Sequence, residues 1–429
     1  MKILVSTPTL CHPDFPHSPN TGFGIMVSCI AEALGKAGQK VYVNNSSFFG
    51  PSSERLGYHL LQRKLRVLLF SSRIKDVVRG FRYAFLARTE SWWTRYNIFK
   101  YYVSIGYNER VIRQIAPDHI HINGLTLSTL PFLVAAVRTG FPFTVTLHGL
   151  NSLDDSVALS PFLKAYEFRM LRLLLENQVQ VSIVSSGGFR KIVNRFGGKH
   201  YPTLSVVLNS VSPIRRSYPD VPRKKRILCV GNIDRRKNQA QLVRAVALLK
   251  DRTDFDVFFI GNDNLNGEVQ LLAQRLGVSD RCHFTGTLPH EEVFSMMNEA
   301  WCTCLLSKDE GFGLSFIEGY CFGLPAICFA DIDAVSDISD ERCTLLIEER
   351  TDEAVSGSIS SVFDRDWDRD YIRLFSRRFS PDILSDAYLS LFKAAPAASL
   401  TEPEICRLMD DYMALGWSKK NFEKAEPVC

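Results

Sequence analysis

Two glutamates that flank a glycine-spaced loop carry the strongest chemical signal in this sequence. Glu310 and Glu318 enclose Gly311 and Gly313, and the segment follows an apolar run and leads into a helical pattern. Such a strand–loop–helix junction directs free backbone N–H groups and the positive end of a helix dipole at an anion. Carboxylates there can accept hydrogen bonds from the hydroxyls of a sugar or a ribose. Most helix-surface glutamates are simply solvated, but the loop between these two, and Gly323 beyond them, favour a binding site.

The N-terminal half offers weaker candidates. Gly22 and Gly24 precede a helical pattern and would let the backbone approach a phosphate or sugar, although a plain tight turn explains them equally well. His148 ends an apolar strand-like run, where a neutral imidazole could hydrogen-bond a hydroxyl. We interpret His119 and His121 as structural residues.

Short apolar, β-rich runs alternate with helical patterns and must position these residues. This alternation is typical of parallel sheets built from βαβ units, so the sequence predicts an α/β fold. Predicted helices cover Ile25–Ala37 and Gln239–Lys250. The predicted strands are Lys2–Ser6, Lys40–Val43, His119–Ile122, Phe143–Leu147, Val181–Ser185, Ser205–Leu208, Arg226–Val230, Asp256–Ile260, Arg281–Thr285, Trp301–Leu306 and Pro325–Phe329.

The length of 429 residues favours two domains. We predict an N-terminal Rossmann-like domain over 1–212, a proline-rich basic linker over 213–226, a C-terminal Rossmann-like domain over 227–375 and a helical tail over 376–429. The tail either completes the second domain or crosses back to the first. Sites in doubly wound sheets form at the carboxyl ends of the strands, so we expect the ligand in the cleft between the domains.

Composition is that of an ordinary globular protein, with 46% hydrophobic and 23% charged residues and a net charge of +5. We see neither a signal peptide nor a membrane-spanning run. Eleven scattered cysteines show no zinc-like pairing and suit a reducing, cytoplasmic location.

Positive charge is concentrated in residues 54–100, which contain eleven Lys or Arg, only three acids and many aromatic residues. This composition suits adsorption to an anionic membrane, which predicts a peripheral protein at its inner face. An ordinary pair of helices with a solvated basic face is an equally good explanation. We find no nucleic-acid recognition module and expect no nucleic-acid partner.

The segment EGFGLSFIEG resembles the Glu-x7-Glu motif of family 4 retaining glycosyltransferases. The resemblance covers most of the chain in order and is strongest from Arg226 to Ile338. It implies the GT-B fold of two facing Rossmann-like, doubly wound domains. It also implies that Glu310 contacts the donor sugar and that Glu318 binds the ribose. The backbone amides of Gly311, Phe312, Gly313 and Leu314 would hold the diphosphate.

Further positions match the same family. Lys237 corresponds to the lysine that neutralises the diphosphate, and the backbone near Leu288 would border the base. Asn232 stands where the family usually has an arginine, so either Arg235 or Arg236 supplies that charge or the diphosphate is held more weakly. In the N-terminal half, Gly22 and Gly24 resemble the first glycine loop, and His148 matches the histidine beside the donor sugar.

The resemblance implies a retaining transfer from a nucleotide-sugar donor to a glycan or lipid-linked acceptor, as in cell-surface polysaccharide synthesis. His148, Lys237 and Glu310 would be the catalytic residues, and we expect no metal and no cofactor. Another GT-B enzyme, such as a nucleotide-sugar epimerase or a phosphorylase, and a non-catalytic GT-B partner protein remain alternatives. The sugar, the base, the acceptor and the oligomeric state have no readable signature.

Overall fold

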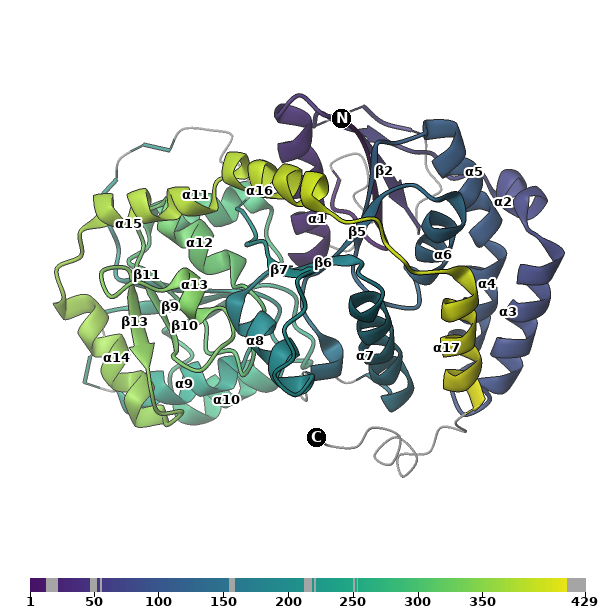
Figure 1. The fold of residues 1–429 in the computed structure, drawn as a ribbon. Helices are drawn as coiled ribbons and strands as arrows, with labels where there is room; N and C mark the ends of the chain where they lie inside the picture. Colours follow the sequence, from purple (N-terminus) through teal and green to yellow (C-terminus); the bar gives the residue numbers. More distant parts are fainter. Residues whose placement is uncertain are drawn as a thin grey trace. The chain divides into compact units, whose positions relative to one another are not determined.

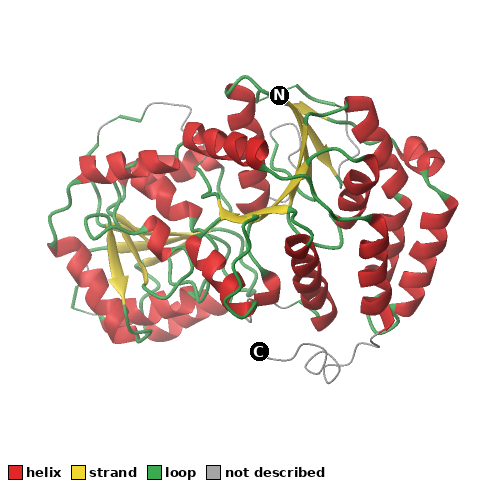
Figure 2. Cartoon of the chain, in the orientation of Figure 1, coloured by secondary structure: helices red, strands yellow, loops and turns green. Residues whose placement is uncertain are grey.

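The computed structural model describes residues 1–12, 22–46, 52–54, 56–153, 159–211, 218–219, 221–249, 251–252 and 254–414. The chain forms two compact units. Unit 1 comprises Met1–Val184, Gly188–Val207 and Pro381–Cys429, and unit 2 comprises Ser185–Gly187 and Leu208–Ser380. In both units helices enclose a sheet, as Figure 2 shows.

Unit 1 is built on a seven-stranded parallel sheet in the order β3-β2-β1-β4-β5-β6-β7. Its central strands are almost completely buried because helices cover both faces, which explains their continuous apolar runs. The strands are β1 Lys2–Thr7, β2 Lys40–Asn45, β3 His59–Leu60, β4 His119–Asn123, β5 Phe143–Leu147, β6 Gln180–Ile183 and β7 Leu204–Val206 (Figure 1).

The helices of unit 1 connect these strands and add a layer at one edge. Ser160 caps α7 by accepting a hydrogen bond from the Leu163 amide, and Gly140 ends α6 in a left-handed conformation. The helices are α1 Gly22–Lys36, α2 Leu65–Ser71, α3 Ile74–Leu86, α4 Trp92–Val103, α5 Ile105–Ile115, α6 Leu130–Thr139, η1 Asn151–Leu153, α7 Pro161–Glu176, α8 Ser186–Arg195, α16 Pro381–Ala394 and α17 Glu402–Ala414.

Unit 2 repeats the plan with a six-stranded parallel sheet in the order β10-β9-β8-β11-β12-β13. The strands are β8 Arg226–Val230, β9 Asp256–Ile260, β10 Cys282–Gly286, β11 Cys302–Cys304, β12 Ala326–Phe329 and β13 Thr344–Ile347. The helices are α9 Gln239–Leu248, α10 Glu268–Leu276, α11 His290–Glu299, α12 Leu314–Cys321, α13 Val335–Ile338, α14 Asp352–Asp364, α15 Arg369–Ser376 and η2 Arg377–Phe379.

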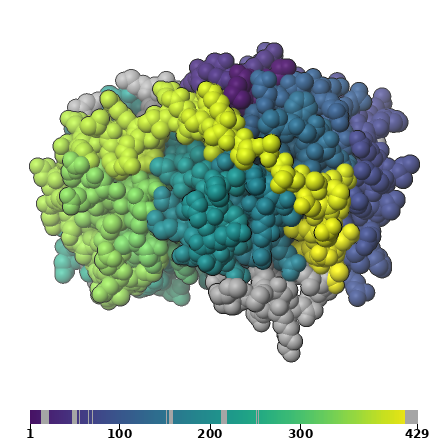
Figure 3. Space-filling model, in the orientation of Figure 1, coloured from purple at the N-terminus to yellow at the C-terminus, as the bar shows by residue number. Residues whose placement is uncertain are grey.

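The C-terminal helices α16 and α17 are part of unit 1. α16 packs against α1, and α17 packs against α3, α6 and α7; both are yellow in Figure 3, on the surface of the protein. A buried ion cluster fixes α17. The guanidinium of Arg138 in α6 donates to Glu402 in α17 at 2.6 and 2.8 Å, to Asp76 in α3 at 2.6 and 2.7 Å and to Glu109 in α5 at 2.8 Å.

All eleven predicted strands are present, and each predicted end lies within two residues of the observed end. The short edge strands β3 and β13 were not predicted. Parts of four predicted features lie outside the described residues: 213–217 and 220 in the linker, 415–429 in the tail, Lys250 at the end of a predicted helix and Arg55 in the basic segment. In the described part of the chain, no helix is both long and apolar enough to cross a membrane.

Candidate active site

The site residues predicted in the C-terminal half lie at the topological switch point of the unit 2 sheet. There β8 and β11 run side by side, and their connections leave in opposite directions. Ligands of doubly wound sheets bind at this point, beyond the carboxyl ends of the strands. The loop after β8 carries Lys237 and the loop after β11 carries Glu310.

Lys237 and Glu310 form a nearly buried ion pair across these two loops. The Lys237 ammonium donates to Glu310 Oε2, and the side chains are only 13% and 11% exposed. The Ser307 hydroxyl donates to the same oxygen at 3.2 Å. Burial alone would raise the pKa of Glu310, but the positive charges of Lys237 and Arg236 and these hydrogen bonds outweigh it and lower that pKa. Glu310 is therefore held as a carboxylate.

The N-terminus of α12 follows directly after the loop that carries Glu310. Gly313 precedes the helix in a left-handed conformation (φ +79°), and no side chain caps the first turn. A Cβ at Gly313 would lie 2.7 Å from the Phe316 ring, so a side chain does not fit there. Phe312 is buried against Phe379. The loop can therefore offer a ligand its backbone amides, but not the Phe312 ring.

Glu318 lies on the same helix and is held by a histidine that the sequence did not single out. His290 Nε2 is 2.9 Å from Glu318 Oε1, and the Glu318 side chain is 9% exposed. Burial of His290 lowers its pKa, but the Glu318 carboxylate outweighs this and the net shift is upward. Leu288, two residues before His290, packs on the apolar cluster of Val293 and Phe322.

Arg236, and not Arg235, lies beside the acidic loop. Its backbone carbonyl accepts from the Lys308 amide at 2.8 Å, and its guanidinium donates to the Asp309 carbonyl at 3.4 Å. Arg235 extends to the surface, where it pairs with Glu268. The Asn232 side chain accepts from the Asn262 amide at 3.3 Å and so bridges the loops after β8 and β9.

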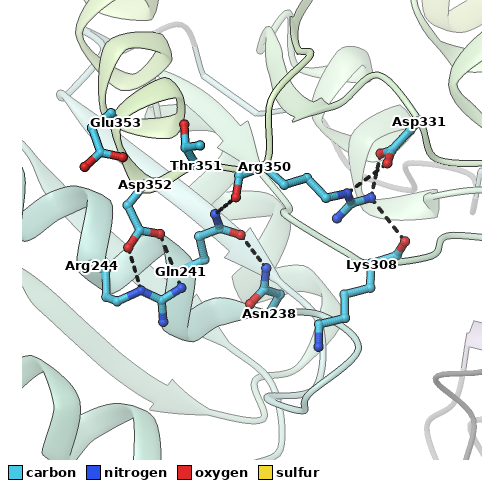
Figure 4. A pocket seen from close by; sticks show the side chains of 9 residues that line it. All are labelled: Asn238, Gln241, Arg244, Lys308, Asp331, Arg350, Thr351, Asp352 and Glu353. Carbon is cyan, nitrogen blue, oxygen red and sulfur yellow. Dashed lines mark hydrogen bonds and ion pairs between the residues drawn. The ribbon is translucent and has the colours of Figure 1, made fainter.

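A polar hollow beside α9 supports the loop after β11 from outside. Figure 4 shows the Arg350 guanidinium directed at Asp331 and at the carbonyl of Lys308. It also donates to the Ser307 carbonyl at 3.3 Å. None of the predicted site residues lines this hollow. Arg350 is the lining side chain that holds the backbone just before Glu310.

The predicted site residues of the N-terminal half lie together in unit 1. His148 follows β5, and its Nε2 is 2.9 Å from Asn123 Oδ1 at the end of β4. Phe23, between Gly22 and Gly24 at the start of α1, packs edge-on against the imidazole at 4.8 Å. Burial lowers the pKa of His148 to about 4, so the ring is neutral at pH 7.

The orientation of Asn123 determines the tautomer of His148. Asn123 Nδ2 donates to the Ser6 carbonyl at 3.5 Å, so Oδ1 faces the imidazole and Nε2 must carry the proton. Nδ1 is then an acceptor, and it is buried without a hydrogen-bond partner among the described residues. A neutral imidazole with one unused acceptor is suited to a hydroxyl ligand.

The two other histidines of this sheet are core residues. His119 and His121 are buried and contact the hydroxyls of Thr144 and Thr146 at 3.2 and 2.8 Å. Both rings pack against Phe392 of α16. Burial lowers the pKa of His119 to about 4 and the pKa of His121 well below its ordinary value.

Three residues of the two clusters were missed from sequence: His290 and Ser307 in unit 2 and Asn123 in unit 1. Ser307 and Asn123 were readable in principle, because each is a polar residue after a strand-like apolar run. His290 carried no signal, because its contact with Glu318 spans 28 positions between two helices. Among the described residues, no group of three or more His, Cys, Asp or Glu side chains is placed to hold a metal ion.

Comparisons with known proteins point to one class. Residues 211–377 match the family model of glycosyl transferases group 1. Over 209 residues, 46% of the chain, the sequence is 25% identical to an MMP alpha-(1->4)-mannosyltransferase of Mycolicibacterium hassiacum. The matched regions span 50% of this relative and 58% of a 2-deoxystreptamine glucosyltransferase of Streptomyces kanamyceticus, so the chain spans about half the length of the curated relatives it matches.

Solved structures show the same fold at lower identity. The lipopolysaccharide outer core galactosyltransferase WaaB in its apo form is 16% identical with a TM-score of 0.60, covering 92% of this chain and 99% of that one. Anabaena HepE in complex with UDP and glucose is 13% identical with a TM-score of 0.65, covering 92% and 100%. With two Rossmann-like sheets, each with its switch point, the chain has the GT-B fold.

Proposed function

We propose that the protein is a retaining glycosyltransferase with a nucleotide-sugar donor, since residues 211–377 match the family model of glycosyl transferases group 1. The Lys237–Glu310 pair carries the proposal, because it lies beside the uncapped N-terminus of α12 at the switch point of the sheet. That arrangement provides a cation, a set of free amides and a carboxylate for one ligand. A sugar joined to a diphosphate has the matching groups.

In this proposal, the charged side chains and backbone amides of unit 2 bind different parts of the donor. The diphosphate binds the amides of residues 311–314 and the positive charges of Lys237 and Arg236. Glu310 accepts a hydrogen bond from a sugar hydroxyl, and Glu318 accepts from the ribose. The backbone at Leu288 borders the base. Because positive charge comes from the chain itself, we expect donor binding to persist in EDTA.

In the reaction, the bond between the anomeric carbon and the diphosphate oxygen breaks. The acceptor hydroxyl forms the new bond on the same face of the sugar, and its proton passes to the departing diphosphate oxygen. Lys237 stabilises the charge that develops on that oxygen. His148, through its unused Nδ1, accepts from a hydroxyl of the transferred sugar. We expect the enzyme to work by positioning and leaving-group stabilisation.

For the acceptor we propose a glycan or a lipid-linked glycan at the cytoplasmic face of an anionic membrane. The basic segment 54–100 supports this choice, and the unpaired cysteines of the described chain agree with a reducing compartment.

A thermal-shift panel of UDP-, GDP- and ADP-sugars tests the donor site. A ligand that binds only the folded state raises the melting temperature, so one nucleotide class should shift the wild type. Glu318→Ala should lose that shift, and Glu348→Ala, which removes an exposed glutamate of the same unit, should keep it. Transfer of labelled sugar to an acceptor separates this proposal from an epimerase, and independence from added phosphate separates it from a phosphorylase. No shift with any donor in folded protein would favour a non-catalytic partner.

A further inference from the structure

Exposed apolar side chains are concentrated on one small part of unit 1. Of the fifteen large hydrophobic residues that are exposed in the described chain, eight lie between positions 70 and 96. We call these eight the aromatic ridge: Phe70, Ile74, Val78, Phe81, Phe85, Trp92, Trp93 and Tyr96. Scattered exposed hydrophobics are normal on a soluble surface, but a contiguous group marks an interaction site.

The ridge has a regular geometry. Ile74, Val78, Phe81 and Phe85 are spaced by four, three and four positions, so they form one stripe along α3. On α4, the neighbouring helix, Trp92 and Trp93 both stack on the Tyr96 ring. Figure 1 shows α3 and α4 side by side at the edge of unit 1, next to α2.

A tight helix contact makes the ridge a rigid platform. A Cβ at Gly80 of α3 would lie 2.9 Å from Tyr102 Cβ and 3.2 Å from the Phe99 carbonyl, both on α4. The rings of Phe81 and Phe99 are 4.3 Å apart. The two helices are therefore closely packed, and the ridge side chains remain on the solvent side.

The C-terminal helix does not cover the ridge, because it binds the opposite side of α3. Arg79 pairs with Glu402 of α17 at 3.2 Å, and the Tyr83 hydroxyl donates to Asp410 at 2.7 Å. These residues fall between the ridge positions in the helical repeat. The stripe is thus a second face of α3, with no covering element among the described residues.

Four cations of the segment 64–100 are not neutralised by an ion pair among the described residues, although Arg73, Lys75, Arg79 and Arg82 of the same segment are paired with acids. Lys64, Arg66, Arg88 and Lys100 have no ion-pair partner in the described part of the chain, and all four are exposed. The two acids of the segment 64–100 offset the positive charge only in part, since the segment contains nine Lys or Arg. Asp76 is buried and bound by Arg138, and Glu90 accepts a hydrogen bond from Ser160. The surface around the ridge is therefore positively charged.

We propose that the aromatic ridge docks the protein on an anionic lipid bilayer. Phe, Ile and Val provide the apolar stripe that enters the acyl boundary, Trp and Tyr suit the headgroup level, and the surrounding cations match anionic headgroups. α3 and α4, with 13 and 12 residues, are too short to span a bilayer, so they lie in its surface. This inference deepens the proposed lipid-linked acceptor but does not depend on the donor chemistry.

Vesicle sedimentation with the full-length chain tests the proposal. Binding to vesicles with about 30% phosphatidylglycerol is expected at low salt, with little binding to purely zwitterionic vesicles and several-fold weaker binding at about 0.5 M salt. The triple variant Phe81→Ser/Phe85→Ser/Trp92→Ser should lower the partition coefficient at least about tenfold. The matched control Leu271→Ser/Leu374→Ser removes exposed leucines of unit 2 and should bind as the wild type.

Charge is tested in the same assay. Lys64→Glu/Arg66→Glu/Arg88→Glu should abolish binding to anionic vesicles, whereas Arg275→Glu, an exposed arginine of unit 2, should have little effect. Equal binding of the ridge variant and the wild type would overturn the proposal. The proposal would also be overturned if the wild type formed a concentration-dependent dimer that the ridge variant does not form, and if neither protein bound vesicles. The aromatic ridge would then bind a second copy of the chain. The ridge variant should keep its donor-induced thermal shift, so failure of this inference is distinguishable from failure of the proposed function.

Discussion

Lys237→Met isolates the electrostatic contribution of the ion pair at the candidate site. Methionine keeps the length and apolar stem of the lysine, so the main change is the loss of the ammonium beside Glu310. Two unit charges about 4 Å apart attract by about 4 kcal/mol at an effective dielectric constant of about 20. Breaking a buried pair costs about 3–5 kcal/mol because the remaining charge is stranded. Glu310 keeps the Ser307 hydroxyl and the charge of Arg236, so we expect a loss of about 2 kcal/mol in the stability of unit 2.

The pH dependence of this loss follows from the pKa of Glu310. A carboxyl whose pKa is lowered by folding stabilises the protein above its ordinary pKa, and this stability is lost as the pH falls through the folded-state value. The pKa of Glu310 is lowered in the wild type, and loss of the Lys237 charge raises it. The stability difference between the two proteins should therefore be complete at neutral pH and should narrow below about pH 4.

A double-mutant cycle measures the coupling. Urea unfolding of the wild type, Lys237→Met, Glu310→Gln and the double variant is compared at pH 7 and pH 4, with hydrogen exchange in β8 and β11 reporting unit 2. The double variant should be more stable than the sum of the two single losses predicts, by about 1 kcal/mol or more at pH 7. Additive losses, or a coupling that does not change with pH, would refute the electrostatic explanation.

Three further outcomes follow from contacts elsewhere. His290→Gln should raise the KM for the donor more than it lowers kcat, because His290 orients Glu318. The pKa of His290 is raised by folding, so the stability that His290 contributes is complete below about pH 6.5 and is lost as the pH rises through the folded-state pKa. Melting temperatures measured across that pH range check this dependence. Arg138→Ala should lower the free energy of unfolding by about 3 kcal/mol, measured in urea, because buried carboxylates lose their cation. The pKa of Glu402 is lowered to about 2, so the part of this stability loss that is due to Glu402 should vanish as the pH falls from about 4.5 to 2. Gly313→Ala should cost about 1–3 kcal/mol and weaken donor binding in calorimetry, since it forces a side chain into a left-handed position.

The buried strands could be predicted from sequence because parallel strands covered on both faces require continuous apolar residues. β5, FTVTL, is buried at every position and was predicted with its observed ends. β3 could not be recognised, since its two residues are held by pairing with β2 and carry no pattern of their own. β13, TLLI, did have an apolar run, but acidic residues directly after it obscured the signal.

The candidate site was predictable only where one local segment contains its chemistry. Glu310, the glycine loop and Glu318 lie within nine positions, so their spacing alone indicated a helix N-terminus with flanking carboxylates. The Arg138–Glu402 contact joins residues 264 positions apart and has no local trace. A contact of that kind depends on how α6 and α17 pack, which the periodicity of either helix does not specify.

Arg235 and Arg236 could not be distinguished from the sequence, but their electrostatic surroundings in the structure differ. Both arginines follow Asn232 within four positions, and the sequence gives them equal weight as replacements for the family arginine. Arg235 is neutralised by Glu268 at the surface, and salt screens what remains of its field. Arg236 lies against the backbone of the Glu310 loop and lowers the pKa of Glu310, so its charge acts inside the site. Asn232 joins the loops after β8 and β9, and we propose that Arg236, four residues later, supplies the positive charge that its position lacks.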